Sequence, residues 1–332
     1  MLERGLTLDF VRVTEAAALA SGYWCGRGNK IAADDAAVRG MRAVFDTIPI
    51  HGTVVIGEGE MDEAPMLYIG ERLGNAESPL VDIAVDPLEG TNLVAKGAAG
   101  AIAVLAAAEK ECLLHAPDMY MDKICVGPAA KGRIALDASV TENVNNVAEA
   151  LGKKVQEVTV VVLDRERHQP IIDELRQCGC RIQLITDGDV APAVATAIPG
   201  SGIDMMIGVG GAPEGVLAAA ALKCMGGDMQ GRLWPEDDED RERMAKMGIA
   251  DDNKLLTMED LAAKDDIIFC ATGITTGPLL RGVVYSGETA TTHSLIMRAK
   301  TGTVRFIETI HDFNKKPLSN LIRKDDPGYA GK

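Results

Sequence analysis

The chain has 332 residues, of which 47% are hydrophobic and 25% are charged. This length exceeds what one hydrophobic core usually supports, so we expect two closely joined layers of structure. The net charge of −15 argues against nucleic-acid binding, which needs a surplus of Lys and Arg, and no apolar run is long enough to cross a membrane.

The cysteines and the N-terminal residues indicate a reducing compartment. The sequence contains 7 cysteines, an odd number, without a Cys-x-x-Cys pair, so neither a structural zinc site nor a disulfide framework is expected. The first residues lack the apolar segment and cleavage site of a secretory signal. A cytoplasmic location is the resulting expectation.

The first part of the chain predicts a sheet flanked by helices. Apolar residues recur either at helical spacing or in short strand-like runs. The expected helices are residues 6–20 and 34–45, and the expected strands are residues 53–56, 81–86, 101–108 and 123–126.

From about residue 139 strands and helices alternate regularly, which favours a largely parallel α/β layer. The expected helices are residues 139–151, 170–177, 190–197 and 216–225, and the expected strands are residues 158–163, 182–185, 205–207, 267–271, 282–285 and 303–307. The chain is therefore expected to divide into an N-terminal α/β half (1–138), a C-terminal α/β half (139–314) and a polar tail (315–332).

The sequence Asp-Pro-Leu-Glu-Gly-Thr, which starts at Asp86, follows a buried apolar run. Pro87 has no N–H to continue a ladder, so we expect the strand to end at Asp86. Asp86, Glu89 and Thr91 supply the hard oxygen ligands that Mg²⁺ or Mn²⁺ prefers, and Gly90 permits close approach of the backbone. Asp, Pro and Gly are also common turn residues, so an ordinary turn is the alternative.

Further acidic residues fall where helices and strands are expected to begin or end: Asp34, Asp35, Glu58 and Glu214. Loops at strand ends are where α/β proteins bind ligands, so these carboxylates are candidate metal ligands. Taken singly, Asp34 and Glu214 are better explained as helix caps or solvated loop carboxylates, so the recurrence of such acids carries the argument.

A glycine-rich loop from Gly208 to Gly215 joins an expected strand to an expected helix. Its spacing does not match the dinucleotide-binding motif G-x-G-x-x-G, because Pro213 occupies the last glycine position, and the chain has no Walker A motif. The loop still predicts an anion site at a helix N-terminus.

Candidate phosphate and sugar contacts follow two neighbouring strands. Arg165 and Arg167 could form a bidentate phosphate clamp, with a solvated charged turn as the alternative. Asp187 and Asp189 fit recognition of polyol hydroxyls or a helix cap. The hydroxyl of Tyr120 could reach a ligand, although a partly buried core tyrosine is the more common case.

These features together resemble the class II fructose-1,6-bisphosphatases, including members that also act on sedoheptulose 1,7-bisphosphate, within the lithium-sensitive, metal-dependent sugar-phosphatase superfamily. The resemblance implies a layered αβαβα sandwich, with two sheets flanked by helices. It extends to about Phe313, and the matching blocks are residues 11–15, 55–60, 62–70, 86–91, 116–121, 208–215 and 271–275.

Matched residue by residue, the resemblance implies a site that binds Mg²⁺ or Mn²⁺ and a phosphorylated sugar. Asp35 stands beside Asp34 where relatives carry other residues, and the register favours Asp34 as the ligand. The implied metal ligands are Asp34 and Glu58 for one ion, and Asp86, Glu89 and Glu214 for another. The implied substrate contacts are Glu89, Gly90, Thr91, Tyr120, Arg165, Arg167, Asp187, Gly188, Asp189 and Gly211.

The resemblance also implicates Thr91 and Asp62 in the chemical step. Thr91 could position or deprotonate water with help from Asp62 or Glu60, or it could attack phosphorus itself. The residues leave these routes open.

The expected activity is metal-dependent hydrolysis of the 1-phosphate of fructose 1,6-bisphosphate, a gluconeogenic reaction, with sedoheptulose 1,7-bisphosphate of the Calvin cycle as a further substrate. An inositol-phosphate or other small phosphomonoester phosphatase of the same superfamily is the nearest alternative. A sugar-phosphate sensor without turnover is the alternative from another class. The resemblance also implies a homo-oligomer, a dimer or a tetramer, without a membrane or nucleic-acid partner.

Overall fold

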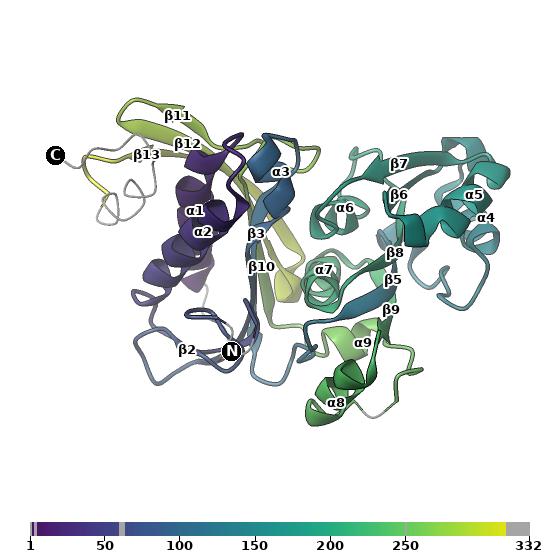
Figure 1. Ribbon diagram of the computed structural model, residues 1–332, viewed down its shortest axis with the longest axis horizontal. Coiled ribbons are helices and arrows are strands. Elements are labelled where there is room, and N and C mark those ends of the chain that lie inside the picture. Colours follow the sequence, from purple (N-terminus) through teal and green to yellow (C-terminus); the bar gives the residue numbers. More distant parts are fainter. Residues whose placement is uncertain (1, 3–4, 60–63, 250, 317–332) are drawn as a thin grey trace. The chain divides into compact units, whose positions relative to one another are not determined.

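The computed structural model describes residues 2, 5–59, 64–249 and 251–316 (Figure 1). The chain divides into two compact units: Met1–Lys110 with Asp266–Lys332, and Glu111–Asp265. This division differs from the expected boundary after residue 138. The chain returns to the first unit at Asp266, because strand β10 begins directly after that residue and pairs with β4 along its whole length.

The first unit contains an eight-stranded sheet in the order β11-β12-β10-β4-β3-β1-β2, with β13 paired to β12. Within this sheet, β1–β3 is the only parallel pairing among the described strands. The strands are β1 (His51–Ile56), β2 (Arg72–Leu73), β3 (Leu80–Glu89), β4 (Ile102–Glu109), β10 (Ile267–Gly273), β11 (Val284–Ser286), β12 (Thr289–Arg298) and β13 (Thr303–Asp312).

The described residues of this unit form the α-helices α1 (Leu6–Ser21), α2 (Lys30–Phe45) and α3 (Thr91–Lys96). Figure 1 shows α1 and α2 side by side against the sheet, where α1 contacts β10, β12 and β4 and α2 contacts β3. Their fully buried Phe10 and Met41 join Ile83 in one hydrophobic core. The side chain of Asn29 accepts a hydrogen bond from the N–H of Ala32, which explains why α2 begins before the expected position 34.

The second unit contains a five-stranded sheet in the order β7-β6-β8-β5-β9. Strand β6 is parallel to β7 and β8, as expected, but β5 is antiparallel to β8 and β9. The parallel layer was expected from about residue 139, so β5 was not part of it, and β9 was not expected as a strand. The expected strand at residues 267–271 is β10, which lies in the sheet of the first unit and is antiparallel to its neighbours, so the prediction is wrong for that strand. The strands are β5 (Tyr120–Val126), β6 (Thr159–Leu163), β7 (Arg181–Ile185), β8 (Met205–Gly211) and β9 (Asp228–Trp234).

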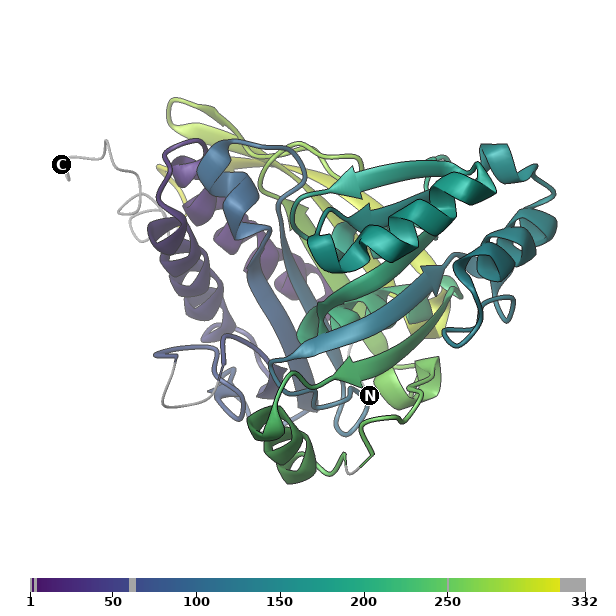
Figure 2. The ribbon, with the colours of Figure 1, turned by 45° about the vertical axis from the view of Figure 1, so that its right-hand side comes forward.

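Helices cover both faces of this second sheet, α4 and α5 on one face and α6 and α7 on the other (Figure 1). Figure 2 views the sheet from the side of α4 and α5. Alternate residues of β6 serve the two faces: Val160 and Val162 join the core under α4 and α5. The helices are α4 (Val140–Leu151), α5 (Gln169–Cys178), α6 (Val190–Ala195), α7 (Ala212–Met225), α8 (Asp238–Lys246) and α9 (Met258–Leu261).

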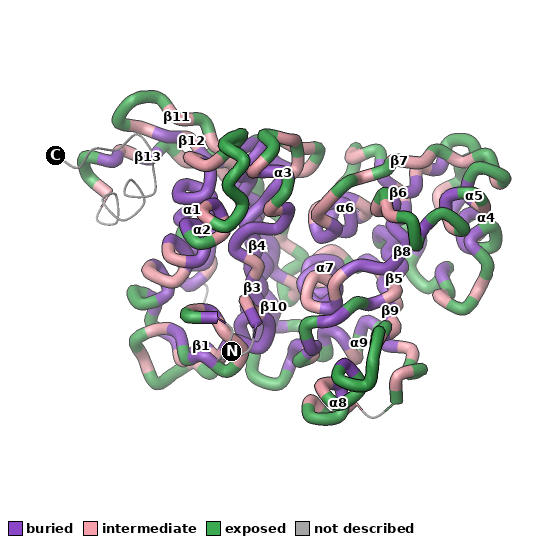
Figure 3. Tube along the Cα trace, in the orientation of Figure 1, coloured by how far each residue is buried: buried purple, intermediate pink, exposed green. Residues whose placement is uncertain are grey.

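The predicted mixed α/β architecture, with two sheets flanked by helices, is confirmed. Buried segments run along β3, β4 and β10, whereas β11 and β13 are largely exposed (Figure 3). None of the described helices combines the length and the apolar composition needed to span a bilayer.

Candidate active site

A β-bulge in β3 places two acidic side chains on the same side of the strand. The prediction that this strand ends at Asp86 is wrong, because β3 continues to Glu89. Asp86 pairs with Val104 of β4 while Glu89 pairs with Ile102, so β3 contains one extra residue in this interval. Residues three apart on a regular strand point to opposite faces of the sheet. The extra residue of the bulge brings the side chains of Asp86 and Glu89 to the same face. Pro87 is tolerated because bulges have no ladder hydrogen bond to lose.

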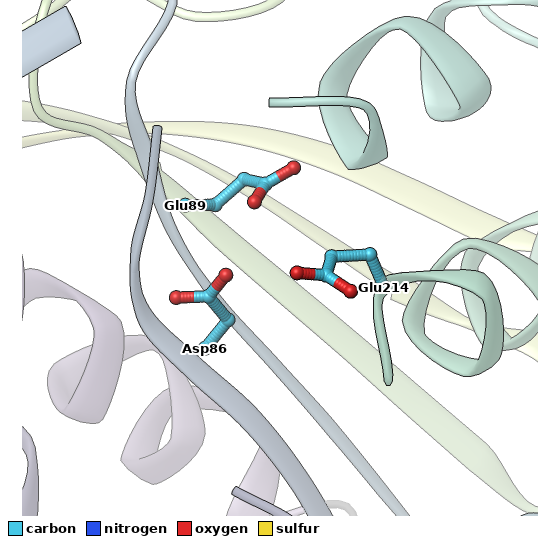
Figure 4. A group of neighbouring side chains, drawn as sticks. All are labelled: Asp86, Glu89 and Glu214. Carbon is cyan, nitrogen blue, oxygen red and sulfur yellow. The ribbon is translucent and has the colours of Figure 1, made fainter. Parts of the chain in front are cut away.

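Asp86 and Glu89 form an acidic pair that could hold a metal ion. A carboxylate oxygen of one lies within 4.8 Å of a carboxylate oxygen of the other. The N–H of Leu88 donates to Oδ1 of Asp86 at 2.9 Å, which fixes that carboxylate. Figure 4 shows both side chains extending from β3, and it shows Glu214 extending from the first turn of α7.

Thr91 is the first residue of α3 and follows directly from the acidic pair. Gly90 precedes it with φ of 88°, a left-handed conformation that glycine adopts most readily. The hydroxyl of Thr91 donates to the carbonyl oxygen of Leu88 at 3.2 Å. Its lone pairs therefore remain available to accept a proton or a hydrogen bond.

The other predicted metal ligands of the first unit lie on α2 and after β1. Asp34 is half-buried in α2, and burial, with a smaller contribution from the charge of Asp35, raises its pKa. Asp35 is exposed and forms an ion pair of 2.6 Å with Arg39, which supports Asp34 as the ligand of the two. The N–H of Glu58 donates to the carbonyl oxygen of Leu67 directly after β1. Asp62 and Glu60 lie outside the described residues.

The predicted substrate contacts of the second unit gather at one edge of its sheet. Strands β6, β7 and β8 run parallel and end at this edge, while β5 begins there with Tyr120 opposite Gly211. Ligands of α/β sheets bind beyond the carboxyl ends of the strands. The residues that the sheet brings to this edge are Tyr120, Arg165, Arg167, Asp187, Gly188, Asp189, Gly211 and Glu214.

The two arginines are held in different ways. Nη2 of Arg165 donates to the carbonyl oxygen of Thr186 at 2.7 Å, which links the loops after β6 and β7. Nη2 of Arg167 donates to the carbonyl oxygen of Val209 at 3.0 Å, and its guanidinium carbon lies 4.6 Å from the centre of the Tyr120 ring. This cation–π contact orients the guanidinium while its other N–H groups can still bind an anion.

Asp189 immediately precedes α6 and is 5% exposed. Its Oδ2 lies 2.8 Å from Nζ of Lys123, which is fully buried on β5. Burial alone would lower the pKa of Lys123, but the negative charges of Asp189 and Glu214 raise it overall. The lysine therefore remains an ammonium ion inside the unit.

Glu214 lies in the first turn of α7, where the helix dipole favours a negative charge. Burial raises the pKa of its carboxyl group, and the charge of Asp189 raises it further, while Lys123 acts in the opposite direction. No hydrogen-bond partner for its buried Oε2 exists among the described residues. A carboxylate oxygen that is buried without a hydrogen-bond partner fits a cation.

Two glycines make room for these carboxylates. A Cβ at Gly211 would lie 1.8 Å from Oε2 of Glu214, and a Cβ at Gly210 would lie 1.9 Å from Oδ2 of Asp189. Glycine is therefore required at these two positions, because acidic side chains pack against them. The sequence had predicted this loop as an anion site.

Sequence reasoning missed two residues that support this edge. Lys123 interrupts an apolar strand between Met121 and Cys125, which was the available signal. His168 is buried, and its Nε2 accepts the N–H of Val209 at 2.8 Å while its Nδ1 lies 2.7 Å from the carbonyl oxygen of Leu163. This arrangement requires the neutral tautomer with the proton on Nδ1. No local pattern marked His168.

The available donors fit a divalent metal ion. The candidates are all carboxylate oxygens, which hard cations prefer, and the unpaired Oε2 of Glu214 needs a positive partner.

The sequence matches known proteins along nearly its whole length. The family model described as "Bacterial fructose-1,6-bisphosphatase, glpX-encoded" matches residues 4–311. The "Fructose-1,6-bisphosphatase 1 class 2" of Escherichia coli (strain K12) is 48% identical over 327 residues, which cover 95% of this chain and 97% of the relative. Proteins called "Fructose-1,6-bisphosphatase class 2" from Escherichia coli O6:H1 and Shigella flexneri match with the same identity and coverage. The chain therefore belongs to the family of glpX-encoded bacterial fructose-1,6-bisphosphatases.

Proposed function

We propose that this protein hydrolyses the 1-phosphate of fructose 1,6-bisphosphate to yield fructose 6-phosphate and phosphate, a reaction of gluconeogenesis. The activity is that of a phosphoric monoester hydrolase and follows from family membership. The observation that carries it is the gathering of two arginines, two aspartates and Glu214 at one edge of the second sheet. Sedoheptulose 1,7-bisphosphate is proposed as a further substrate.

The proposed cofactor is Mg²⁺ or Mn²⁺. Asp34 and Glu58 are assigned to one ion, and Asp86, Glu89 and Glu214 to another. When bound, such ions lower the pKa of water and neutralise charge on the transferring phosphoryl group. The raised pKa of Glu214 and its unpaired Oε2 support this assignment.

The proposed substrate contacts divide by chemistry. Arg165 and Arg167 bind the phosphate that is retained, because guanidinium groups match phosphate oxygens in pairs. Asp187 and Asp189 accept hydrogen bonds from sugar hydroxyls, and Gly188 with φ of 74° turns the chain between them. The remaining contacts, at the scissile phosphate and the ring, are assigned to Glu89, Gly90, Thr91, Tyr120 and Gly211.

Thr91 is assigned to the chemical step together with Asp62. Thr91 is the first residue of α3 and closely follows the acidic pair in the sequence. Its hydroxyl can therefore hold an attacking water or attack phosphorus itself. In the first route an acidic neighbour accepts the proton.

Phosphate release tests this function. Purified protein should release phosphate from fructose 1,6-bisphosphate only when Mg²⁺ or Mn²⁺ is present, and Asp86→Asn should abolish release. Undiminished turnover in chelator would contradict the proposal. Parallel assays with sedoheptulose 1,7-bisphosphate and an inositol monophosphate define the substrate class, and tight sugar binding without phosphate release would favour a sensor.

A homo-oligomer, a dimer or a tetramer, is also proposed. Support comes from the exposed apolar residues Phe306 and Ile310 on β13, which pairs with β12. Light scattering on the purified protein measures the oligomer size.

A further inference from the structure

Lys123 is an unusual residue for the middle of a buried strand. Its side chain is 0% exposed, as are Met121 and Cys125, which share its face of β5. An apolar residue would satisfy the packing at this position, because a buried ammonium ion costs stability unless it is paired. The lysine therefore calls for an explanation beyond the core.

The ammonium group joins three elements of the second unit. It lies 2.8 Å from Oδ2 of Asp189 at the start of α6, and it donates to the carbonyl oxygen of Gly211 at 2.8 Å. Gly211 ends β8 and directly precedes α7, whose first turn carries Glu214. The ammonium group of Lys123 on β5 thus contacts the residues that precede α6 and α7, at the edge of the sheet where the predicted substrate contacts gather.

The backbone around this cation is shaped to bring its partners close. A Cβ at Gly210 would lie 1.9 Å from Oδ2 of Asp189 and 3.1 Å from Cε of Lys123. Only a residue without a side chain leaves room for the ion pair. Three separate features, the lysine, the aspartate and the glycine, therefore serve one contact.

We propose that Lys123 is a positioning residue for sugar-phosphate binding: it fixes the carboxylate of Asp189 and the carbonyl of Gly211, so that the sugar-contacting turn keeps one geometry. This inference rests on the proposed function, because Asp189 is assigned there to sugar hydroxyls. Lys123 itself contacts no substrate in this assignment. It acts through Asp189.

A double-mutant cycle of Lys123→Met and Asp189→Asn tests the inference. Two quantities are measured: the KM for fructose 1,6-bisphosphate, and the affinity for fructose 6-phosphate in chelator by calorimetry. Each single variant should weaken both by at least about tenfold, and the double variant should be hardly weaker than either single variant. Lys223→Met is the matched control, because Lys223 pairs with Glu259 at the far end of α7.

Several results would overturn the inference. A merely structural lysine would give losses that add in the double variant, and an unaffected KM in Lys123→Met would exclude any role. If Lys123→Met does not fold, Lys123→Gln enters the cycle, since its amide keeps a donor for Gly211 while losing the charge. Failure of the wild type to turn over would overturn the proposed function as well; normal wild-type turnover with an uncoupled cycle would overturn this inference alone.

Discussion

At the scale of single residues, the second unit places charge where a stable core would not. Lys123 is fully buried, Glu214 is half-buried with its Oε2 removed from water, and the pKa of Glu214 is raised first by burial and then by the charge of Asp189. Buried charges of this kind cost stability. Such costs are common at functional sites, where the geometry needed for activity is maintained by the rest of the fold.

His168 makes the free energy of unfolding depend on pH. Burial lowers the pKa of His168, and the charges of Arg167 and Arg165 lower it further. Because the pKa is lowered in the folded protein, the unfolded chain binds the proton first. The stabilisation from neutral His168 is complete above the unfolded pKa and is lost as the pH falls through the folded value.

We therefore expect the free energy of unfolding to decrease from about pH 8 to about pH 5 more steeply in the wild type than in His168→Gln. Glutamine keeps one donor and one acceptor but does not titrate in this range. Urea unfolding at each pH measures the two slopes, and the difference removes the contribution of the other histidines. Equal slopes would show that His168 does not control the pH response.

At the scale of elements, the residue that precedes α7 is required by the candidate site and not by the helix. Gly211 has φ of −67°, which any residue can adopt, but an added Cβ would lie 1.8 Å from Oε2 of Glu214. The end of a flexible side chain can move away at little cost. The glycine is therefore needed for the position of the carboxylate and not for the helix.

Gly211→Ala should lower kcat/KM by more than about tenfold, with the free energy of unfolding changed by less than ~1 kcal/mol. Kinetic assays and urea unfolding of the same preparation measure both. Gly5→Ala is the control, because no heavy atom of the described residues, apart from its own chain neighbours, lies within 4 Å of an added Cβ there. A large loss of stability without loss of activity would contradict the interpretation.

Elements also differed in how well the sequence predicted them. Helix α4 was predicted closely because Ser139 accepts the N–H of Glu142 at its start. Strand β12 was missed because its inward face carries Thr292 and Ser294, which are buried but polar. Their hydroxyls form hydrogen bonds to His311 and Thr272, and a search for apolar runs cannot detect such a strand.

At the scale of the whole molecule, the proposed metal ligands come from widely separated parts of the sequence, from Asp34 to Glu214. A ligand that binds only the folded chain stabilises it in proportion to the logarithm of its concentration above the Kd. The stability of the whole chain should therefore respond to the metal.

We expect Mn²⁺ to raise the unfolding temperature of the wild type, and we expect Asp86→Asn and Glu214→Gln each to reduce this rise. In chelator, Glu214→Gln should unfold at the same temperature as the wild type or higher, since it removes a buried charge. Calorimetry with and without Mn²⁺ measures these shifts, with the exposed Glu242→Gln as control. A full wild-type shift in either site variant would argue against the assignment.

The sequence by itself determined the features that depend on neighbouring residues. These include the strongly periodic helices, most strands, the acidic motif that starts at Asp86, and the family blocks that indicated a metal-dependent sugar phosphatase. The helices, the strands and the acidic motif are each encoded within a few consecutive turns or residues, so local spacing is sufficient to detect them; the family was indicated by the resemblance of whole blocks.

Only the tertiary structure decided the features that depend on distant segments. The pairing of β10 with β4 set the limits of the units, the bulge opposite Val104 and Ile102 turned Glu89 to the side of Asp86, and the packing around β5 paired Lys123 with Asp189. Strand pairing and burial join residues far apart in the chain, so no local pattern contains them. The sequence supplies the residue types that the chemistry needs, and the pairing of distant segments determines how they are arranged.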